Sequence, residues 1–171
     1  MSRVLYLIAC AAGPTRQVGD GVRAAQARGW DTCLVLSPSA ARWHAGHIQE
    51  LEELTGHPVR WEYKLPSQPD VLPKADAILV SPLSATSLNK WGAGIADTLA
   101  IGIPLEAVHL GVPVVVQPFF STLLAAHPAV PRSVATLEEQ GVRVVWAPGE
   151  PHPTKQALPW PWELGLDALG M

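Results

Sequence analysis

Residues 75–92 read ADAILVSPLSATSLNKWG, a short apolar run followed at once by a segment rich in hydroxyl side chains. The run at 75–81 has the length and composition of a buried strand. Ser84 to Ser87 then stand at the start of a helical pattern, where hydroxyl oxygens accept hydrogen bonds from the first backbone N–H groups. A helix start of this kind also presents N–H groups to an anion. The stretch therefore predicts a strand, a turn suited to a phosphate and a helix.

Strand-like apolar runs alternate with helical patterns along the rest of the chain. The predicted strands are 3–10, 31–37, 58–64, 75–81, 112–118 and 141–148, and the predicted helices are 15–29, 39–56, 84–102 and 131–140. Ser39 is the expected N-cap of the second helix. Short runs of Val, Ile and Leu separated by helices are typical of a parallel sheet buried on both faces. We therefore predict an α/β fold with a doubly wound parallel sheet in a single domain.

Length, composition and charge exclude several classes of protein. The 171 residues suffice for one compact domain with its own core. The apolar runs are shorter than the roughly 20 residues that a membrane span needs, and we interpret the N-terminal run as the first strand rather than a secretory signal. The net charge is −3 and the basic residues are scattered, which disfavours nucleic acid as a partner. We expect a cytoplasmic protein with neither a membrane nor a nucleic-acid partner.

Residues 151–171 form a tail rich in Pro and Trp, which follows a predicted domain at 1–150. We expect the tail to wrap the surface or to reach a neighbouring subunit. Trp160 and Trp162 are interpreted as a lid over a ligand or, preferably, as anchors in a subunit contact.

Cysteine and histidine give no sign of a metal site. Cys10 and Cys33 fall in predicted strands and are expected in the core as reduced thiols. His44 and His47 have a spacing that places two side chains on one helix face, but no third ligand accompanies them. No metal is predicted.

The candidate ligand site lies beyond the carboxyl ends of the strands. In a doubly wound sheet, ligands bind there, at the point where the direction of the crossover connections reverses. The loops at 11–17, 37–40 and 81–87 are dense in small and hydroxyl residues, which suit a phosphate. The first loop lacks GxGxxG and the second strand ends without a carboxylate, which disfavours NAD. No GxxxxGK[ST] occurs, so a P-loop NTPase is excluded. A mononucleotide such as FMN fits better, although each loop alone is also explained as an ordinary helix cap.

The segment PLSATSLNKWGAGIADTLA at 82–100 resembles the signature of the homo-oligomeric flavin-containing cysteine decarboxylase family. That family includes phosphopantothenoylcysteine decarboxylase and the lantibiotic peptidyl-cysteine decarboxylases. The matching positions are Pro82, Ser84, Ala85, Lys90, Gly94, Ile95, Ala96, Asp97 and Leu99. The segments 37–43, 74–82 and 141–150 are similar to other parts of the family, so the likeness extends over most of the chain.

The resemblance implies a Rossmann-like fold of the flavoprotein type that binds FMN. It also implies a homotrimer or dodecamer, and a small thiol or a cysteine-containing peptide as substrate. Carried over position by position, the cofactor-binding residues would be Gly13, Pro14, Thr15, Ser37, Ser39, Ser84, Ala85, Thr86 and Ser87.

The catalytic positions of the family are altered in this chain. The family's histidine, about fourteen residues before the signature proline, is replaced by Gln68, which cannot accept a proton near neutral pH. The signature asparagine is replaced by Thr86, and residues 118–125 keep only the proline of the family's Pro-x-Met-Asn-x-x-Met-Trp substrate motif. No catalytic residue is therefore assigned. The histidines available to replace the base are His57, His109, His127 and His152.

Three interpretations of function remain open. The first is a flavin-dependent, decarboxylase-like lyase or oxidoreductase that acts on a small thiol or peptide. The second is a non-catalytic flavin-binding subunit of an assembly. The third is a degenerate member of the family that keeps the oligomer and binds no flavin.

Overall fold

The centre of the molecule is a parallel sheet with the strand order β2-β1-β3-β4-β5, in a computed structural model that describes residues 1–153 and 159–170. The strands are β1 (Val4–Ala9), β2 (Asp31–Leu36), β3 (Ala77–Leu83), β4 (Val114–Pro118) and β5 (Arg143–Val144). Every neighbouring pair of strands is parallel. The crossover direction reverses between β1 and β3, which confirms the predicted doubly wound α/β fold.

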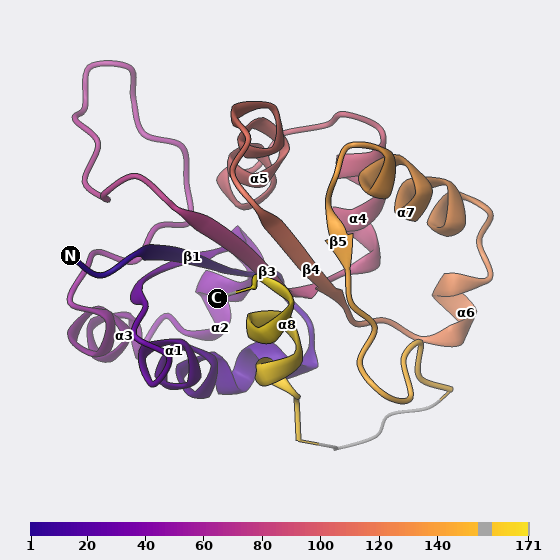
Figure 1. Ribbon diagram of the computed structural model, residues 1–171, viewed down its shortest axis with the longest axis horizontal. Coiled ribbons are helices and arrows are strands. Elements are labelled where there is room, and N and C mark those ends of the chain that lie inside the picture. Colours follow the sequence, from indigo (N-terminus) through magenta and orange to yellow (C-terminus); the bar gives the residue numbers. More distant parts are fainter. Residues whose placement is uncertain (154–158, 171) are drawn as a thin grey trace.

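Helices cover both faces of the sheet (Figure 1). One face packs against α1 (Val18–Gln26), α2 (Pro38–Trp43), α3 (Ile48–Thr55) and α8 (Trp162–Ala168), and the other against α4 (Ala85–Gly92), α5 (Leu99–Ala107) and α7 (Ala129–Glu139). Shorter elements are η1 (Gly13–Gln17), η2 (Val108–Leu110) and α6 (Thr122–Ala125). Leu5 and Leu7 of β1 join one core cluster and Ile8 joins the other, because successive side chains of a strand point to opposite faces.

Two predicted strands differ from the structure. The prediction of a strand at 58–64 is wrong, since only one isolated bridge joins Arg60 to Val35 of β2. Beyond it, an ion pair of 3.2 Å between Lys64 and Asp70 helps to fold the chain back into a loop. The strand expected at 141–148 is confined to the two residues of β5.

Two predicted helices are each divided into two. The pattern at 39–56 forms α2 and α3, and Ser37 rather than Ser39 is the N-cap, because Pro38 favours the first helical position. The Oγ of Ser37 accepts a hydrogen bond of 3.2 Å from the backbone N–H of Ala40. The pattern at 84–102 forms α4 and α5, and Gly94, with a φ of +74°, turns the chain between them.

The described part of the tail folds back onto the sheet. Trp162 of α8 is 5% exposed and belongs to the same core cluster as α1 and β1. A Cβ on Gly21 would lie 2.6 Å from the Trp162 ring, so only glycine allows this close approach. The expectation that Trp162 anchors a neighbouring subunit is therefore wrong, because its ring is buried within its own chain. Residues 154–158 and 171 of the tail lie outside the described residues.

A buried polar network holds the entry to α8. The indole Nε1 of Trp160 donates to the Oγ of Ser81 at 2.9 Å, and that hydroxyl donates to the Oε1 of Gln117 at 2.9 Å. The Nε2 of Gln117 donates to the carbonyl of Pro161 at 3.1 Å. Ser81 therefore attaches the tail to the sheet and takes no part in capping α4.

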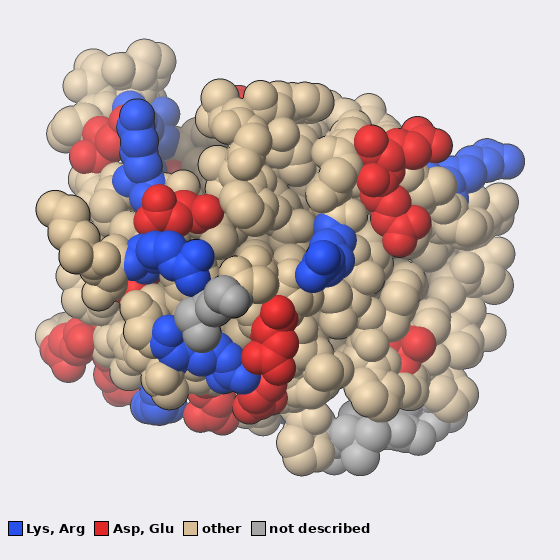
Figure 2. Space-filling model, viewed as in Figure 1, with Lys and Arg blue, Asp and Glu red and all other residues tan. Residues whose placement is uncertain are grey.

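Charged side chains of both signs are interspersed on the face of the molecule shown in Figure 2, without a continuous basic field. In the part of the chain that the structure describes, no helix combines the length and the apolar character that crossing a membrane requires.

Candidate functional site

The loops that follow β1, β2, β3 and β4 meet at one edge of the sheet. The backbone N–H of Ser37 donates to Ala9 at 3.0 Å, and that of Cys10 donates to Pro82 at 3.1 Å. The N–H of Phe119 donates to Leu83 at 3.0 Å, which adds the loop after β4. The three loops expected to bind a ligand are thus brought together at the reversal point between β1 and β3, where doubly wound sheets bind their ligands.

Serine begins the helix that follows three of these strands. Ser37, Ser84 and Ser121 all have extended backbones, with ψ between 157° and 159°, and each Oγ accepts from the N–H three residues on. Ser121 was not expected as a cap, although it follows β4 in the same way that Ser84 follows β3. The repeated geometry results from the strand-to-helix turn itself, which needs a short side chain that accepts a hydrogen bond.

The remaining hydroxyl groups of the expected site serve mainly local structure. Thr15 is buried and its Oγ1 donates to the carbonyl of Cys10, which closes the first loop. The Oγ of Ser84 donates to the Oγ of Ser87 at 3.0 Å, and Thr86 is exposed. The Oγ of Ser39 accepts a hydrogen bond of 2.8 Å from the guanidinium of Arg42. Arg42 was not expected at the site, and its position three residues after Ser39 on one helix is the signal that identifies it.

Cys10 is buried beside the third loop. Burial raises the pKa of its thiol above the ordinary value, although hydrogen bonds with Ser87 and Ser84 lower it. The thiol is therefore protonated at neutral pH and packs as a small apolar group.

An open groove of about 1720 Å³ lies beside the first loop. Its lining includes Gly13, Pro14, Arg16, Trp43, His44, Phe119, His152 and Trp160. Of the expected site residues, Gly13 and Pro14 line the groove, whereas Thr15, Ser37, Ser39 and Ser84 to Ser87 do not. The groove is open to solvent and is larger than the roughly 300–1,000 Å³ of a typical small-ligand pocket.

Phe119, Trp160 and His152 form a cluster in the lining of this groove. The ring centroids of Phe119 and His152 are 4.5 Å apart, and those of Phe119 and Trp160 are 5.4 Å apart with the rings edge to face. The Nδ1 of His152 lies 3.0 Å from both carboxylate oxygens of Glu150. A Cβ on Gly13 would lie 3.4 Å from the Phe119 ring, so this cluster adjoins the first loop.

Residues 43–158, more than half of the chain, match the family described as Flavoprotein. The chain belongs to the Flavoprotein family. A phosphopantothenoylcysteine decarboxylase of Arabidopsis thaliana is 32% identical over 71 residues, which are 42% of this chain. The matched part spans only 34% of that relative's length.

Solved structures of cysteine decarboxylases share the fold of this flavoprotein. The peptidyl-cysteine decarboxylase EpiD is 19% identical, with a TM-score of 0.76 and 99% of each chain covered. The FMN-dependent cysteine decarboxylase SpaF is 22% identical, with a TM-score of 0.71, covering 98% of this chain and 97% of that one. These matches confirm the Rossmann-like fold of the flavoprotein type.

The described residues of this flavoprotein fit a flavin. Backbone N–H groups and hydroxyls gather at the loops after β1, β2 and β3, as a phosphate requires. The apolar rings of Trp43, Phe119 and Trp160 line the adjoining groove, as an aromatic ring system requires. Family membership and this donor set together point to a flavin as the class of cofactor.

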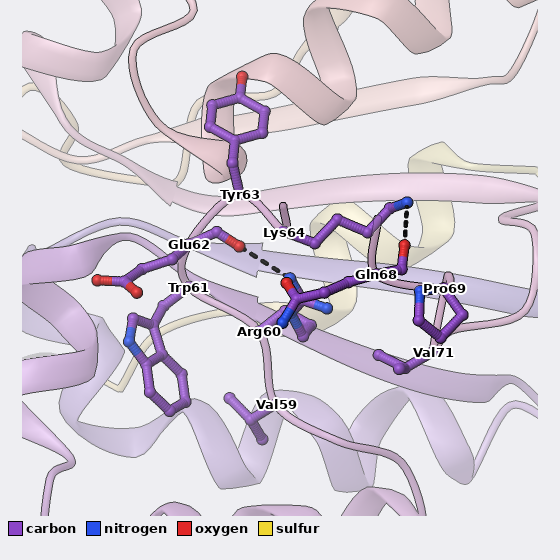
Figure 3. Close-up of a pocket in the computed structure, with 9 residues that line it drawn as sticks. All are labelled: Val59, Arg60, Trp61, Glu62, Tyr63, Lys64, Gln68, Pro69 and Val71. Carbon is purple, nitrogen blue, oxygen red and sulfur yellow. Dashed lines mark hydrogen bonds between the residues drawn. The ribbon is translucent and has the colours of Figure 1, made fainter. Parts of the chain in front are cut away.

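Gln68 of this flavoprotein lies in the loop between α3 and β3, which projects from the body of the molecule (Figure 1). A small hollow of about 350 Å³ lies in this loop (Figure 3). The Oε1 of Gln68 accepts a hydrogen bond of 2.8 Å from the N–H of Leu65, and Lys64 donates to the Gln68 carbonyl at 2.8 Å. Gln68 therefore closes a turn and supplies no base.

The other candidate histidines separate into two groups. His57 pairs with Asp31 at 2.7 Å, at the amino end of β2 and thus at the opposite edge of the sheet from the loops. His109 and His127 are exposed and lie outside the groove lining. His152 is the one of the four that lines the groove.

His44 and His47 also line the groove, but each has a local partner. The Nε2 of His44 lies 2.9 Å from the carbonyl oxygen of Thr15, and the Nδ1 of His47 lies 3.4 Å from Glu50. Within residues 1–153 and 159–170, no three His, Cys, Asp or Glu side chains are grouped as metal ligands would be.

Proposed function

We propose that this flavoprotein binds FMN at the carboxyl edge of its sheet and uses it for redox chemistry on a small thiol or a cysteine-containing peptide. The observation that carries the proposal is the meeting of the loops after β1, β2, β3 and β4 at one edge of the sheet, beside a groove lined by Gly13 and Pro14 of the first loop and by Phe119 after β4. The solved relative SpaF, of the same fold, is an FMN-dependent cysteine decarboxylase.

The phosphate of FMN would bind at the loops after β2 and β3. The start of α4 presents backbone N–H groups, together with the hydroxyls of Ser84, Thr86 and Ser87. Arg42, which already contacts Ser39, adds a positive charge at the second loop. Gly13 and Pro14 would contact the cofactor from the first loop, where a side chain on Gly13 would approach Phe119.

When bound, FMN supplies a two-electron acceptor, so that a cysteine thiol can be oxidised to a thiocarbonyl that takes up the electrons released with CO2. The chain itself supplies the aromatic side chains of Trp43, Phe119 and Trp160, which would line the groove beside the reacting thiol. Thr86 offers a hydroxyl at the position where the family carries asparagine.

A non-catalytic flavin-binding subunit is the second candidate. The observation that favours it is the structural role of Gln68, whose side chain is occupied by a turn at the position of the family's histidine. This candidate keeps the cofactor and loses the chemistry, so the two candidates differ in whether a thiol reduces the bound flavin.

Flavin binding is tested by the absorbance spectrum of the purified chain and by the mass of the small molecule released on denaturation. We expect FMN, or uptake of added FMN by the apoprotein. Ser84→Leu should abolish binding because the larger side chain removes the cap and occupies the turn. The matched control is Ser67→Leu, in the exposed loop between α3 and β3. Full FMN occupancy in Ser84→Leu would show that the phosphate lies elsewhere.

Redox activity is tested by adding thiols to the FMN-loaded chain under anaerobic conditions. We expect peptides ending in cysteine, or small thiols, to bleach the flavin absorbance and to lose CO2. A flavin that no thiol reduces would favour the non-catalytic subunit.

A further inference from the structure

We propose that His152, held in place by Glu150, accepts the proton of the thiol substrate in this flavoprotein. The inference rests on the proposed function, because it concerns the same groove and the same substrate class. The proposed base is His152 and not the residue at position 68, where this chain has glutamine instead of the family's histidine.

The backbone fixes His152 at the carboxyl edge of the sheet. Its N–H donates to the carbonyl of Phe120 at 3.2 Å, and its carbonyl accepts from the N–H of Thr122 at 2.9 Å. These two bonds form a parallel bridge between His152 and Ser121, directly after β4. The imidazole is therefore placed by strand-like pairing rather than by a free loop, which suits a group that must meet a reacting atom.

The side chain of His152 is held from two directions. Both oxygens of Glu150 lie 3.0 Å from Nδ1, and the Glu150 side chain is only 6% exposed. The ring of Phe119 packs against the imidazole, with centroids 4.5 Å apart. The geometry leaves little freedom for the ring to rotate.

Within residues 1–153 and 159–170, the second ring nitrogen of His152 remains available. Nε2 has no hydrogen-bond partner in the part of the chain that the structure describes, and His152 lines the groove together with Gly13 and Trp160. With a carboxylate accepting the Nδ1 proton, Nε2 carries the lone pair and can act as a base. The arrangement is that of a carboxylate that orients a histidine for proton transfer.

The step consists of one proton transfer. The S–H bond of the substrate breaks, the proton bonds to Nε2, and the electron pair stays on sulfur as a thiolate. The imidazolium then lies against the Glu150 carboxylate, so the total charge of substrate and pair is unchanged. The thiolate is the form of the substrate that donates electrons to an oxidised flavin, the acceptor named in the proposed function.

The tautomer of His152 tests the role of Glu150 without any activity measurement. In ¹⁵N NMR spectra of the apoprotein with the His152 imidazole in its neutral form, we expect the proton on Nδ1 and none on Nε2. Glu150→Ala should lose this fixed tautomer. An unprotonated Nδ1 in the wild-type chain would overturn the proposal, because Nε2 would then carry the proton.

Thiolate formation is tested with a peptide that ends in penicillamine, whose sulfur-bearing carbon has no hydrogen and cannot be oxidised to a thiocarbonyl. With FMN-loaded wild-type chain at neutral pH, we expect the long-wavelength absorbance of a thiolate beside oxidised flavin. His152→Asn should bind FMN equally well and lose this band, because asparagine can still donate to Glu150 but accepts no proton as a base. An undiminished band in His152→Asn would overturn the proposal.

Turnover of a peptide that ends in cysteine separates this inference from the proposed function. His152→Asn should reduce the rate of flavin bleaching by about 10²–10⁴-fold, the usual loss for a general base. His109→Asn, at an exposed position outside the groove, should leave the rate unchanged. A wild-type rate in FMN-loaded His152→Asn overturns the inference alone, whereas a wild-type chain that binds no FMN overturns the proposed function and the inference with it.

Discussion

Ser81 and Ser84 are three residues apart and serve different parts of the molecule. Ser81 lies within β3, immediately before Pro82, and its hydroxyl links the sheet to Trp160 of the tail. Ser84 has an extended backbone and caps α4. The hydroxyls of this cluster therefore have different roles, because Ser81 lies within β3 and Ser84 lies after the strand has ended.

The cap at Ser84 makes a measurable contribution to stability. Ser84→Ala should lower the free energy of unfolding by about 1 kcal/mol, because the N–H of Ser87 loses its acceptor. Urea unfolding followed by circular dichroism measures the change. Thr86→Ala, at an exposed position of the same helix, is the control and should lose much less. Equal losses in the two variants would contradict the assignment of the cap.

The buried thiol of Cys33 predicts a loss of stability at alkaline pH. Burial raises its pKa from 9.0 to about 12, and the charge of Asp31 adds to the effect. The unfolded chain therefore ionises this thiol near pH 9 while the folded chain keeps it protonated. The stabilisation is complete below about pH 9 and is lost as the pH rises toward 12, at up to about 1.4 kcal/mol per pH unit.

The measurement is the free energy of unfolding in urea at pH 8.5 and above, compared between the wild-type chain and Cys33→Ala. We expect a shallower decline in the variant, whatever its stability at neutral pH. Tyr6, whose pKa burial also raises to about 12, contributes to the decline in both proteins. Identical slopes would show that the thiol ionises equally in the folded and unfolded chains.

At the scale of the elements, α8 packs closely on its neighbours. A Cβ on Gly165 would lie 2.4 Å from the Oε1 of Gln117, and one on Gly21 would lie 2.6 Å from the Trp162 ring. Glycine at both positions lets α8 contact the sheet and α1 directly. The element belongs to the core although it is short and follows a segment rich in proline.

Gly21→Ala should displace α8 and destabilise the protein by about 1–3 kcal/mol, the cost of overpacking a core. Thermal unfolding measures the loss, and tryptophan fluorescence reports the changed surroundings of Trp162. Gly46→Ala is the matched control, since nothing lies within 4 Å of a Cβ there. A variant at Gly21 as stable as this control would mean that α8 does not pack on α1 in solution.

At the scale of the whole molecule, we propose that the chain associates with copies of itself, as the family resemblance implies. Leu123 and Leu124 of α6 are 83% and 54% exposed, and they follow the functional edge of the sheet. Exposed apolar side chains that are neighbours favour burial against a partner.

Sedimentation velocity should show a trimer or a larger assembly, and Leu123→Glu should shift the chain toward the monomer. Leu110→Glu is the control. The side chain of Leu110 is exposed to a similar extent, at 79%, but it lies before β4, at the other edge of the sheet. A wild-type chain that sediments as a monomer would contradict the proposal.

Local patterns in the chain were sufficient to predict the order and type of most elements. The runs at 3–10, 31–37 and 75–81 became β1, β2 and β3 within two residues at each end, because strand length and apolar content are properties of neighbouring residues. The strand-to-helix turns that follow them were predicted for the same reason. Parallel pairing follows once such runs alternate with helices.

Contacts between distant residues decided the rest, and no local pattern contains them. Trp160 donates a hydrogen bond to Ser81, which is 79 residues away in the sequence. This contact holds the tail against its own sheet rather than against a neighbouring subunit. His152 meets Phe119 and the groove only because its backbone pairs with the segment after β4. Such pairs form only when the sheet and its helices have assembled. The free energy that stabilises them comes from burial and from hydrogen bonds that exist only in the folded protein.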